Sequence, residues 1–197
     1  MKVVVATDNP GKLREFRRLL APLNWTVLGK KEAGCLDEIP ETGSTFAENA
    51  FIKASAVARL TGLPALADDS GLCVDALDGA PGLYSARFTG SHADSDERRN
   101  EYLLEKLQGA ADRSAHYVCS LSLVFPDGTH LQTEENCCGE ILETPAGCGG
   151  FGYDPLFRPD GFNCSMAELT DSEKDDISHR GKAIRALARI WEDTHND

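Results

Sequence analysis

Short β-rich runs alternate with segments of helical periodicity in the first part of the chain. Residues 2–6 (KVVVA) predict a strand that stops at a cluster of turn-forming residues, 7–11. Apolar residues then recur at roughly helical spacing from Leu13 to Leu23, with charged residues between them, which predicts a helix. Residues 25–29 (WTVLG) predict a second strand, so the chain begins with a strand, a glycine-containing loop and a helix.

Three further helices are predicted, over residues 45–60, 94–108 and 178–191. The first two open with residues at capping-box spacing, and each is followed by a glycine that can end it. The capping pairs are Thr45 with Glu48 and Asp94 with Glu97, and the glycines are Gly62 and Gly109.

An acidic pair lies between two predicted strands. Residues 64–68 and 71–77 are β-rich, which puts Asp68 and Asp69 at the end of a strand or in a tight turn. Within a strand, neighbouring side chains point to opposite faces, so at most one of the two carboxylates would face a given ligand.

Residues 114–125 and the β-rich run that follows flank the turn signal at 126–128, which predicts a hairpin. Strands that alternate with helices, together with this hairpin, predict an α/β fold with a mixed sheet and flanking helices. We expect a single domain over residues 1–197, because the chain shows no internal repeat or linker. In open sheets, ligands bind beyond the carboxyl ends of strands, where residues 7–12 and 68–70 lie.

The chain is acidic, with 20 lysines and arginines against 32 aspartates and glutamates and a formal net charge of −12. Nucleic-acid polymers and anionic membranes are bound mainly through clustered lysine and arginine, so we expect neither as a partner. No window approaches the ~20 apolar residues of a membrane span, and the first residues do not resemble a signal peptide. The seven cysteines contain no C-x-x-C pair and fit a reducing compartment, so we expect a cytoplasmic protein.

Residues 7–12 (TDNPGK) join a predicted strand to a predicted helix. The N-terminus of a helix presents free N–H groups and a partial positive charge, both of which suit phosphate, and Lys12 adds a full charge. The Walker pattern G-x-x-x-x-G-K-[ST] is absent. By itself the segment fits either a phosphate site or an ordinary turn between a strand and a helix.

The acidic segment 68–71 (DDSG) can supply a carboxylate to Mg²⁺, which prefers one or two carboxylates, several waters and the phosphate oxygens of a substrate. Glu41 and Glu48 are further candidate ligands, and a solvated acidic turn is the alternative. The flanking apolar runs favour a paired or metal-bound charge, because an unpaired charge in such surroundings is unfavourable. The chain lacks a G-x-S-x-G elbow and a cysteine–histidine signature, so metal-assisted hydrolysis fits better than a covalent nucleophile.

A glycine-rich segment, residues 149–155 (GGFGYDP), lets the backbone pass close to a ligand. Phe151 and Tyr153 offer flat faces on which a nucleotide base could stack. A tight structural turn is the alternative interpretation.

Positive charge gathers around the start of the last predicted helix, at Lys174, His179, Arg180 and Lys182. Cations at a helix N-terminus are unfavourable for the helix dipole unless an anion is bound there too. The alternative is a set of solvated charges that neighbouring acidic residues neutralise.

A series of short motifs occurs in one order along the chain. They are TDNPGK (7–12), ETGSTFxENA (41–50), KA (53–54), ADDSGL (67–72), GAPGxYSAR (79–87), GGFGYDP (149–155), AEL (167–169), EK (173–174) and SHRGKA (178–183). Together they closely resemble the inosine triphosphate pyrophosphatase family, over nearly the whole chain.

The resemblance implies a long mixed sheet with flanking helices and two lobes around a central nucleotide cleft. It also implies a Mg²⁺-dependent enzyme, usually a homodimer, that converts the noncanonical purine nucleotides ITP, dITP and XTP to the monophosphate and pyrophosphate. The attacked phosphorus is then the α-phosphorus, and a water oriented by Asp69 would attack it in line.

The resemblance also assigns roles to individual residues. Asp69 is the general base and a metal ligand, and Glu41 contributes to the metal site. The triphosphate would be bound by Thr7, Asp8, Asn9, Pro10, Gly11 and Lys12, with Lys53 as a further phosphate contact and Ser70 on the substrate. The nucleotide pocket would comprise Phe151, Gly152, Tyr153, Asp154, Lys174, His179 and Arg180.

Selectivity has a physical basis in the bases themselves. Hypoxanthine and xanthine carry an oxygen at C6 where adenine carries an amino group, so a fixed donor at that position leaves adenine with a donor facing a donor. An unpaired buried polar group is unfavourable by ~1–3 kcal/mol. We expect the donors to lie around His179 and Arg180.

Position 8 departs from the family, which more often has Gly or Asn there. A carboxylate beside a triphosphate should weaken binding unless it faces solvent or helps to hold Mg²⁺.

Two other functions compete with the one implied: a Maf-type pyrophosphatase for modified pyrimidine nucleotides, and a nucleotide-binding regulator without catalysis. The SHR and FGYD motifs speak against the first, and the presence of Asp69, Glu41 and Lys12 speaks against the second.

Overall fold

The computed structural model describes residues 1–195, so the last two residues of the predicted domain lie outside the described part. The chain forms two compact units. Unit 1 comprises Met1–Asp69, Cys119–Glu135 and the segment from Arg180 onward, and unit 2 comprises Ser70–Val118 and Asn136–His179. Two units agree with the two lobes that the family resemblance implies.

Six strands form one mixed sheet, as predicted, in the order β2-β1-β3-β4-β5-β6. Strand β1 pairs in parallel with β2 and β3, whereas β5 pairs antiparallel with β6. The strands are β1 (Lys2–Val5), β2 (Thr26–Gly29), β3 (Ala65–Val74), β4 (Ser114–Val124), β5 (His130–Ile141) and β6 (Phe157–Pro159). The predicted hairpin joins β4 to β5, and its turn is closed by hydrogen bonds from Gly128 N–H to Phe125 O and from Phe125 N–H to Thr129 O.

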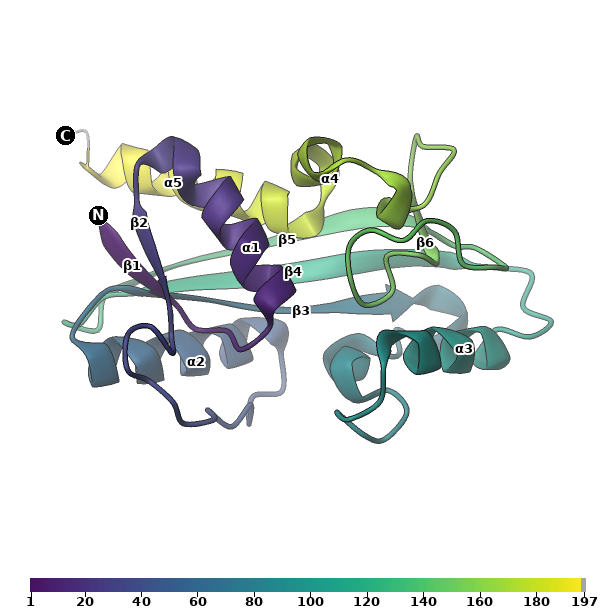
Figure 1. Ribbon diagram of the computed structural model, residues 1–197, viewed down its shortest axis with the longest axis horizontal. Coiled ribbons are helices and arrows are strands. Elements are labelled where there is room, and N and C mark those ends of the chain that lie inside the picture. Colours follow the sequence, from purple (N-terminus) through teal and green to yellow (C-terminus); the bar gives the residue numbers. More distant parts are fainter. Residues whose placement is uncertain (196–197) are drawn as a thin grey trace. The chain divides into compact units, whose positions relative to one another are not determined.

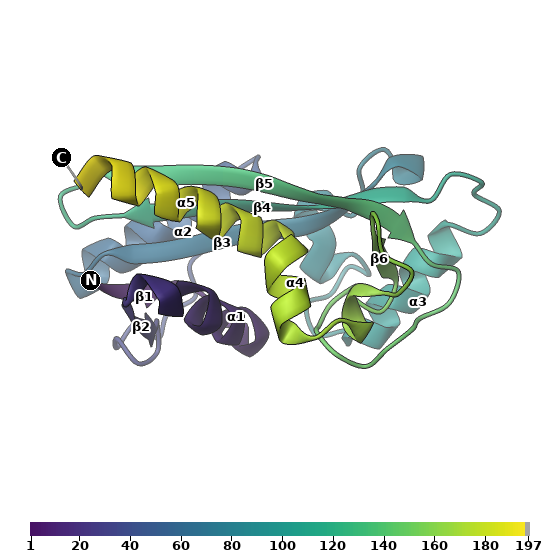
Figure 2. The same cartoon turned by 90° about the horizontal axis from the view of Figure 1, so that it is seen from above.

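In unit 1 the sheet is covered on both faces (Figures 1 and 2). Helices α1 (Pro10–Leu20) and α5 (His179–His195) lie on one face, and α2 (Phe46–Thr61) lies on the other. On the first face, the strands and helices pack together in an apolar cluster that includes Val3, Val5, Phe16, Leu20, Ile184 and Leu187. On the second face, a second apolar cluster includes Val4, Ala65 and Ala67 together with Ala54, Val57 and Ala58 of α2. Small residues on α2 let it lie close to the strands.

In unit 2, helices α3 (Asp96–Lys106) and α4 (Asp171–Ile177) lie on opposite faces of the strands (Figure 1). The core of this unit is a single apolar cluster that includes Leu72, Leu103, Tyr117, Tyr153 and Phe157. Within residues 1–195, no helix is both long and apolar enough to cross a membrane.

The acidic pair does not end a strand, contrary to prediction. Residues 64–68 and 71–77 were expected as two strands, but β3 runs without a break from Ala65 to Val74. Asp68 and Asp69 are therefore central strand residues. Polar residues inside a strand are unusual unless they are paired, and both carboxylates have partners, as described below.

Two predicted helix starts also need correction. Ser95, not Asp94, is the N-cap of α3, because its side chain accepts a hydrogen bond from the Arg98 N–H. Thr45 caps α2 as expected, but the Glu48 carboxylate accepts from the N–H and hydroxyl of Ser44 and so completes a different turn. Helix α4 was not predicted, since its seven residues carry little apolar periodicity.

Candidate active site

The predicted site residues fall into two groups, one in each unit. Unit 1 contains residues 7–12, Glu41, Lys53, Asp69 and Arg180, and unit 2 contains Ser70, residues 151–154, Lys174 and His179. The chain passes from one unit to the other between Asp69 and Ser70 and again between His179 and Arg180. Two of the four crossings between the units therefore fall between predicted site residues.

The segment 7–12 is shorter as a loop than predicted, because α1 already begins at Pro10. Asn9 is the N-cap: its Oδ1 accepts from the Lys12 N–H at 3.1 Å, and its own N–H donates to Thr7 Oγ1 at 3.2 Å. Pro10 suits the first helical position, where its missing N–H has no partner to lose. Residues 10–12 thus form the first turn of α1, whose partial positive charge suits phosphate.

Asp68 lies on the face of the sheet that α1 and α5 cover. Its Oδ2 contacts Lys12 Nζ at 2.9 Å and Arg180 Nη2 at 2.8 Å. The Arg180 guanidinium also contacts Glu15, and its side chain is only 1% exposed. Burial by itself would raise the pKa of Asp68, but the charges of Lys12 and Arg180 outweigh burial and hold the pKa well below its ordinary value.

Asp69 lies on the opposite face, which α2 covers. Its Oδ2 accepts from Asn49 Nδ2 at 3.1 Å, and its Oδ1 lies 3.2 Å from Lys53 Nζ. The same ammonium contacts Glu41 Oε1 at 2.6 Å. Burial raises the pKa of Asp69, with Lys53 opposing that shift and Glu41 adding to it. A carboxylate with a raised pKa is a stronger base once ionised, as a general base requires.

The strand geometry therefore separates the two aspartates, as the side-chain alternation predicted. Asp68 is tied into an ion-pair network between helices, whereas Asp69 lies beside a second carboxylate and a lysine. Asp69 is 8% exposed, whereas Asp68 is 2% exposed. This difference favours Asp69 as the carboxylate that meets a ligand.

The carboxylates of Asp69 and Glu41 fit a Mg²⁺ site by the chemistry of their donor set. Both contact one cation, the Lys53 ammonium, so their oxygens converge on positive charge. Among residues 1–195, no group of three or more His, Cys, Asp or Glu side chains could hold a metal ion. Mg²⁺ commonly takes only one or two carboxylates and completes its shell with water and phosphate oxygens, so two suffice.

Arg180 has a different environment from the one predicted. It was expected to contact the nucleotide and to need a bound anion, but its guanidinium is buried and already contacts Asp68 and Glu15. Lys174 was expected just before a helix, but it lies in the last turn of α4, where a cation is favourable. The argument from misplaced charge therefore fails for these two residues.

The glycine-rich segment of unit 2 forms a tight turn around Asp154. The Asp154 Oδ2 accepts from the Phe151 N–H at 2.9 Å and from Lys174 Nζ at 2.7 Å. A Cβ at Gly150, whose φ is +71°, would lie 2.1 Å from that same oxygen, so the turn requires glycine there. Lys174 Nζ also lies 4.8 Å from the centre of the Phe151 ring, and this cation–π contact holds the ring in place.

Of the two predicted stacking faces, only Phe151 fits. Its side chain is half-buried, whereas Tyr153 is 4% exposed, belongs to the core of unit 2 and donates its hydroxyl to Ser85 O. His179 stacks on Tyr117, with ring centres 4.7 Å apart and planes within 8°. A base can therefore stack on Phe151 but not on Tyr153.

Several residues of the site were not predicted. One is Asn49, which lies four residues before the predicted Lys53 on α2 and so on the same face of that helix; this spacing could have identified it. Asp96 and Asn100 of α3 bind the backbone N–H and O of Gly152 at 2.6 and 3.1 Å. They are far from Gly152 in sequence, so no local pattern indicates these contacts.

The Asp68 network predicts acid sensitivity. A carboxylate whose folded pKa is depressed stabilises the fold above its unfolded pKa of about 3.9, and that stability is lost as the pH falls below it. We expect the free energy of unfolding, measured by urea titration, to fall as the pH is lowered from about 5 to about 3, across that unfolded pKa. Asp68→Asn should flatten this slope. An equal slope in the variant would show that other carboxylates cause it.

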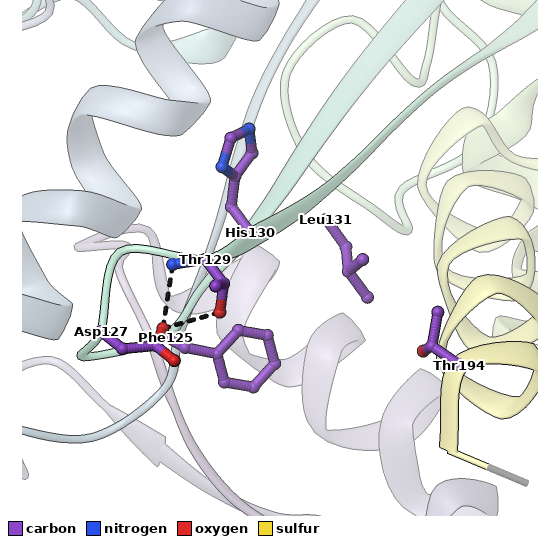
Figure 3. Close-up of a pocket in the computed structure, with 6 residues that line it drawn as sticks. All are labelled: Phe125, Asp127, Thr129, His130, Leu131 and Thr194. Carbon is purple, nitrogen blue, oxygen red and sulfur yellow. Dashed lines mark hydrogen bonds between the residues drawn. The ribbon is translucent and has the colours of Figure 1, made fainter. Parts of the chain in front are cut away.

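A separate pocket of about 310 Å³ lies at the β4–β5 turn of unit 1 (Figure 3). Its lining residues are Phe125, Asp127, Thr129, His130, Leu131 and Thr194. None of these is a predicted site residue, and the Asp127 carboxylate is occupied by the N–H and hydroxyl of Thr129. With no lysine or arginine in its lining, the pocket lacks the charge that a triphosphate needs.

Comparison with known proteins identifies relatives over nearly the full length. A sequence model of the Ham1 family matches residues 3–190. The chain is 48% identical over 193 residues to the dITP/XTP pyrophosphatase of Streptomyces coelicolor, with 96% of each chain covered. It is 52% identical over 193 residues to that of Deinococcus deserti, with 98% of this chain and 90% of the relative covered. The solved structure of a HAM1 protein from Coxiella burnetii superposes with a TM-score of 0.88 at 40% identity, covering 98% of this chain and 99% of that one.

Proposed function

The chain belongs to the Ham1 family, and from this membership we infer that it is a nucleoside triphosphate pyrophosphatase that acts on noncanonical purine nucleotides such as dITP, ITP and XTP. The products are the nucleoside monophosphate and pyrophosphate. The observation that carries the assignment to particular residues is the contact of Lys53 with both Glu41 and Asp69, on the face of β3 that α2 covers.

In unit 1, some residues bind the triphosphate and others activate the attacking water. The N–H groups in the first turn of α1 and the Lys12 ammonium bind the triphosphate, and Lys53 adds a second positive charge. Asp69 accepts the proton of a water that attacks the α-phosphorus in line, and Asn49 fixes the orientation of its carboxylate. Arg180 acts as a positioning residue, because it holds Asp68, which in turn holds Lys12.

Asp69 and Glu41 would hold Mg²⁺, in keeping with their shared contact to Lys53. A bound divalent cation would neutralise charge on the phosphate oxygens. Lys53, whose ammonium lies beside both carboxylates, would add a positive charge for phosphate.

The glycine-rich segment of unit 2 supplies the base pocket. Phe151 stacks on the purine, and Lys174 and Asp154 keep its ring in place. Donors to the C6 oxygen come from His179 and backbone N–H groups, since the Arg180 guanidinium is engaged by carboxylates. A donor at C6 favours hypoxanthine and xanthine over adenine.

Neither competing function fits the family membership. A Maf-type pyrophosphatase for modified pyrimidines belongs to another family, and the curated relatives are named as enzymes, not as regulators. We also propose a homodimer, which the family resemblance implies, and a cytoplasmic location. The seven cysteines are all free thiols, which suits a reducing compartment.

Release of pyrophosphate by the purified chain tests the proposed function. We expect rapid turnover of dITP, ITP and XTP with Mg²⁺, and kcat/KM lower by at least about 10²-fold for ATP. Chelation of the metal with EDTA should abolish turnover, and added Mg²⁺ should restore it. Preference for 5-methyl-UTP, or full activity in EDTA, would contradict the proposal.

A further inference from the structure

An ion pair links the segment that binds the triphosphate to the end of β2. Asp8 Oδ2 lies 2.6 Å from Lys30 Nζ, and the same ammonium donates to Asp37 O at 2.9 Å. The side chain of Lys30 is 4% exposed, whereas that of Asp8 is 49% exposed. Such burial of a lysine is unusual and requires a partner.

The backbone of Lys30 is fixed as firmly as its side chain. Its N–H donates to Val5 O at 3.1 Å, and its O accepts from the Cys35 N–H at 2.9 Å. Val5 is the last residue of β1, directly before the segment that leads to α1. Lys30 is therefore held against the end of β1, and its ammonium meets the one carboxylate within residues 7–12.

The Asp8 carboxylate puts a negative charge close to the proposed triphosphate site, and Lys30 offsets that charge. Asp8 immediately precedes Asn9, the N-cap of α1, and like charge close to a triphosphate weakens binding. Lys31 also approaches Asp8, but at 3.5 Å and with a side chain that is 67% exposed, so solvent screens its charge. Among the described residues that contact Asp8, Lys30 alone is buried.

We propose that Lys30 is a positioning residue for the triphosphate: it neutralises Asp8 and holds the segment before α1 in the conformation that accepts phosphate. This inference rests on the proposed function, because it takes residues 7–12 as the triphosphate site. It concerns binding and not the chemical step, since Lys30 does not contact Asp69 or Glu41 in the described contacts.

Steady-state kinetics with dITP tests the proposal. Lys30→Met removes the charge but keeps the length of the side chain, and we expect KM to rise by about tenfold or more with kcat within about twofold. Lys31→Met is the matched control, and its KM should stay within about twofold of the wild-type value. The double variant Asp8→Asn/Lys30→Met should lower KM part of the way back, because the repelling carboxylate is gone although the ion pair that holds the segment is still missing.

The outcomes separate the two claims. A wild-type chain that does not hydrolyse dITP overturns the proposed function, whereas an active chain whose KM is unchanged by Lys30→Met overturns only the role of Lys30. A loss of kcat that the double variant does not rescue assigns Lys30 a structural role and also overturns it. If Lys30→Met does not fold, Asp8→Asn decides alone: it breaks the ion pair that holds the segment before α1, so a higher KM supports the proposal and an unchanged or lower KM contradicts it.

Discussion

Replacing Asp69 with Asn is expected to lower kcat for dITP by about 10²–10⁴-fold, the usual effect of removing a general base. Asparagine keeps the size of the side chain and can still bond to Asn49, but it cannot accept a proton from water. In the proposed function the triphosphate is bound by α1 and Lys12, so the affinity for dITP should fall much less than kcat. Single-turnover kinetics and calorimetric titration with dITP would measure the two effects separately.

The matched control for this variant is Asp75→Asn. Asp75 lies directly after the last residue of β3, and its side chain is 56% exposed, so its carboxylate lies outside the buried environment of Asp69. We expect the control to retain wild-type kcat. An Asp69→Asn enzyme with kcat within tenfold of wild type would remove Asp69 as the base, and a loss of dITP binding would indicate a binding role instead.

Replacing Arg180 with Met is expected to destabilise the fold by about 3–5 kcal/mol, because breaking a buried ion pair leaves charges without compensation. Arg180 is 1% exposed and contacts both Asp68 and Glu15, so both carboxylates would lose a partner. For a chain of this length, such a loss lowers Tm by about 10 °C. Urea unfolding followed by circular dichroism would measure the change.

The exposed pair of Arg17 and Glu32 provides the control. Its atoms lie 2.7 Å apart, but both side chains are more than 40% exposed, so Arg17→Met should change stability by less than about 1 kcal/mol. A further variant, Arg180→Met with Asp68→Asn and Glu15→Gln, should recover part of the loss, because the unpaired charges are gone. Equal effects of Arg17→Met and Arg180→Met would contradict the account of the buried network.

Local patterns in the sequence were sufficient for most of the fold. The strand-loop-helix unit at the start, the hairpin turn at 126–128 and the cap at Thr45 follow from residues close together in the chain, and the structure confirms them. The sequence predicts two strands where the structure has the single strand β3, because two adjacent aspartates are typical of a turn. Only the tertiary structure supplies Lys12 and Arg180, whose charges allow Asp68 to lie inside a strand.

The sequence predicts those residues of the candidate site that belong to a local motif. It does not predict the features that depend on contacts between residues far apart in the chain. The side-chain alternation correctly separated Asp68 from Asp69. The sequence could not show that Arg180 is saturated by Asp68 and Glu15, or that Tyr153 belongs to a core, because these facts depend on contacts across many residues. The same holds for Lys30, whose partner lies on another strand-to-helix connection.

The location of the triphosphate is the central claim, and a crystal structure with Mg²⁺ and a dITP analogue tests it most directly. The analogue would carry a methylene group between the α- and β-phosphorus, so that it is not hydrolysed. We predict phosphate oxygens on the first turn of α1 and on Lys12, with Mg²⁺ bound by Asp69 and Glu41. A nucleotide bound elsewhere, for example in the pocket at the β4–β5 turn, with Lys53 still joining Asp69 to Glu41, would contradict the account.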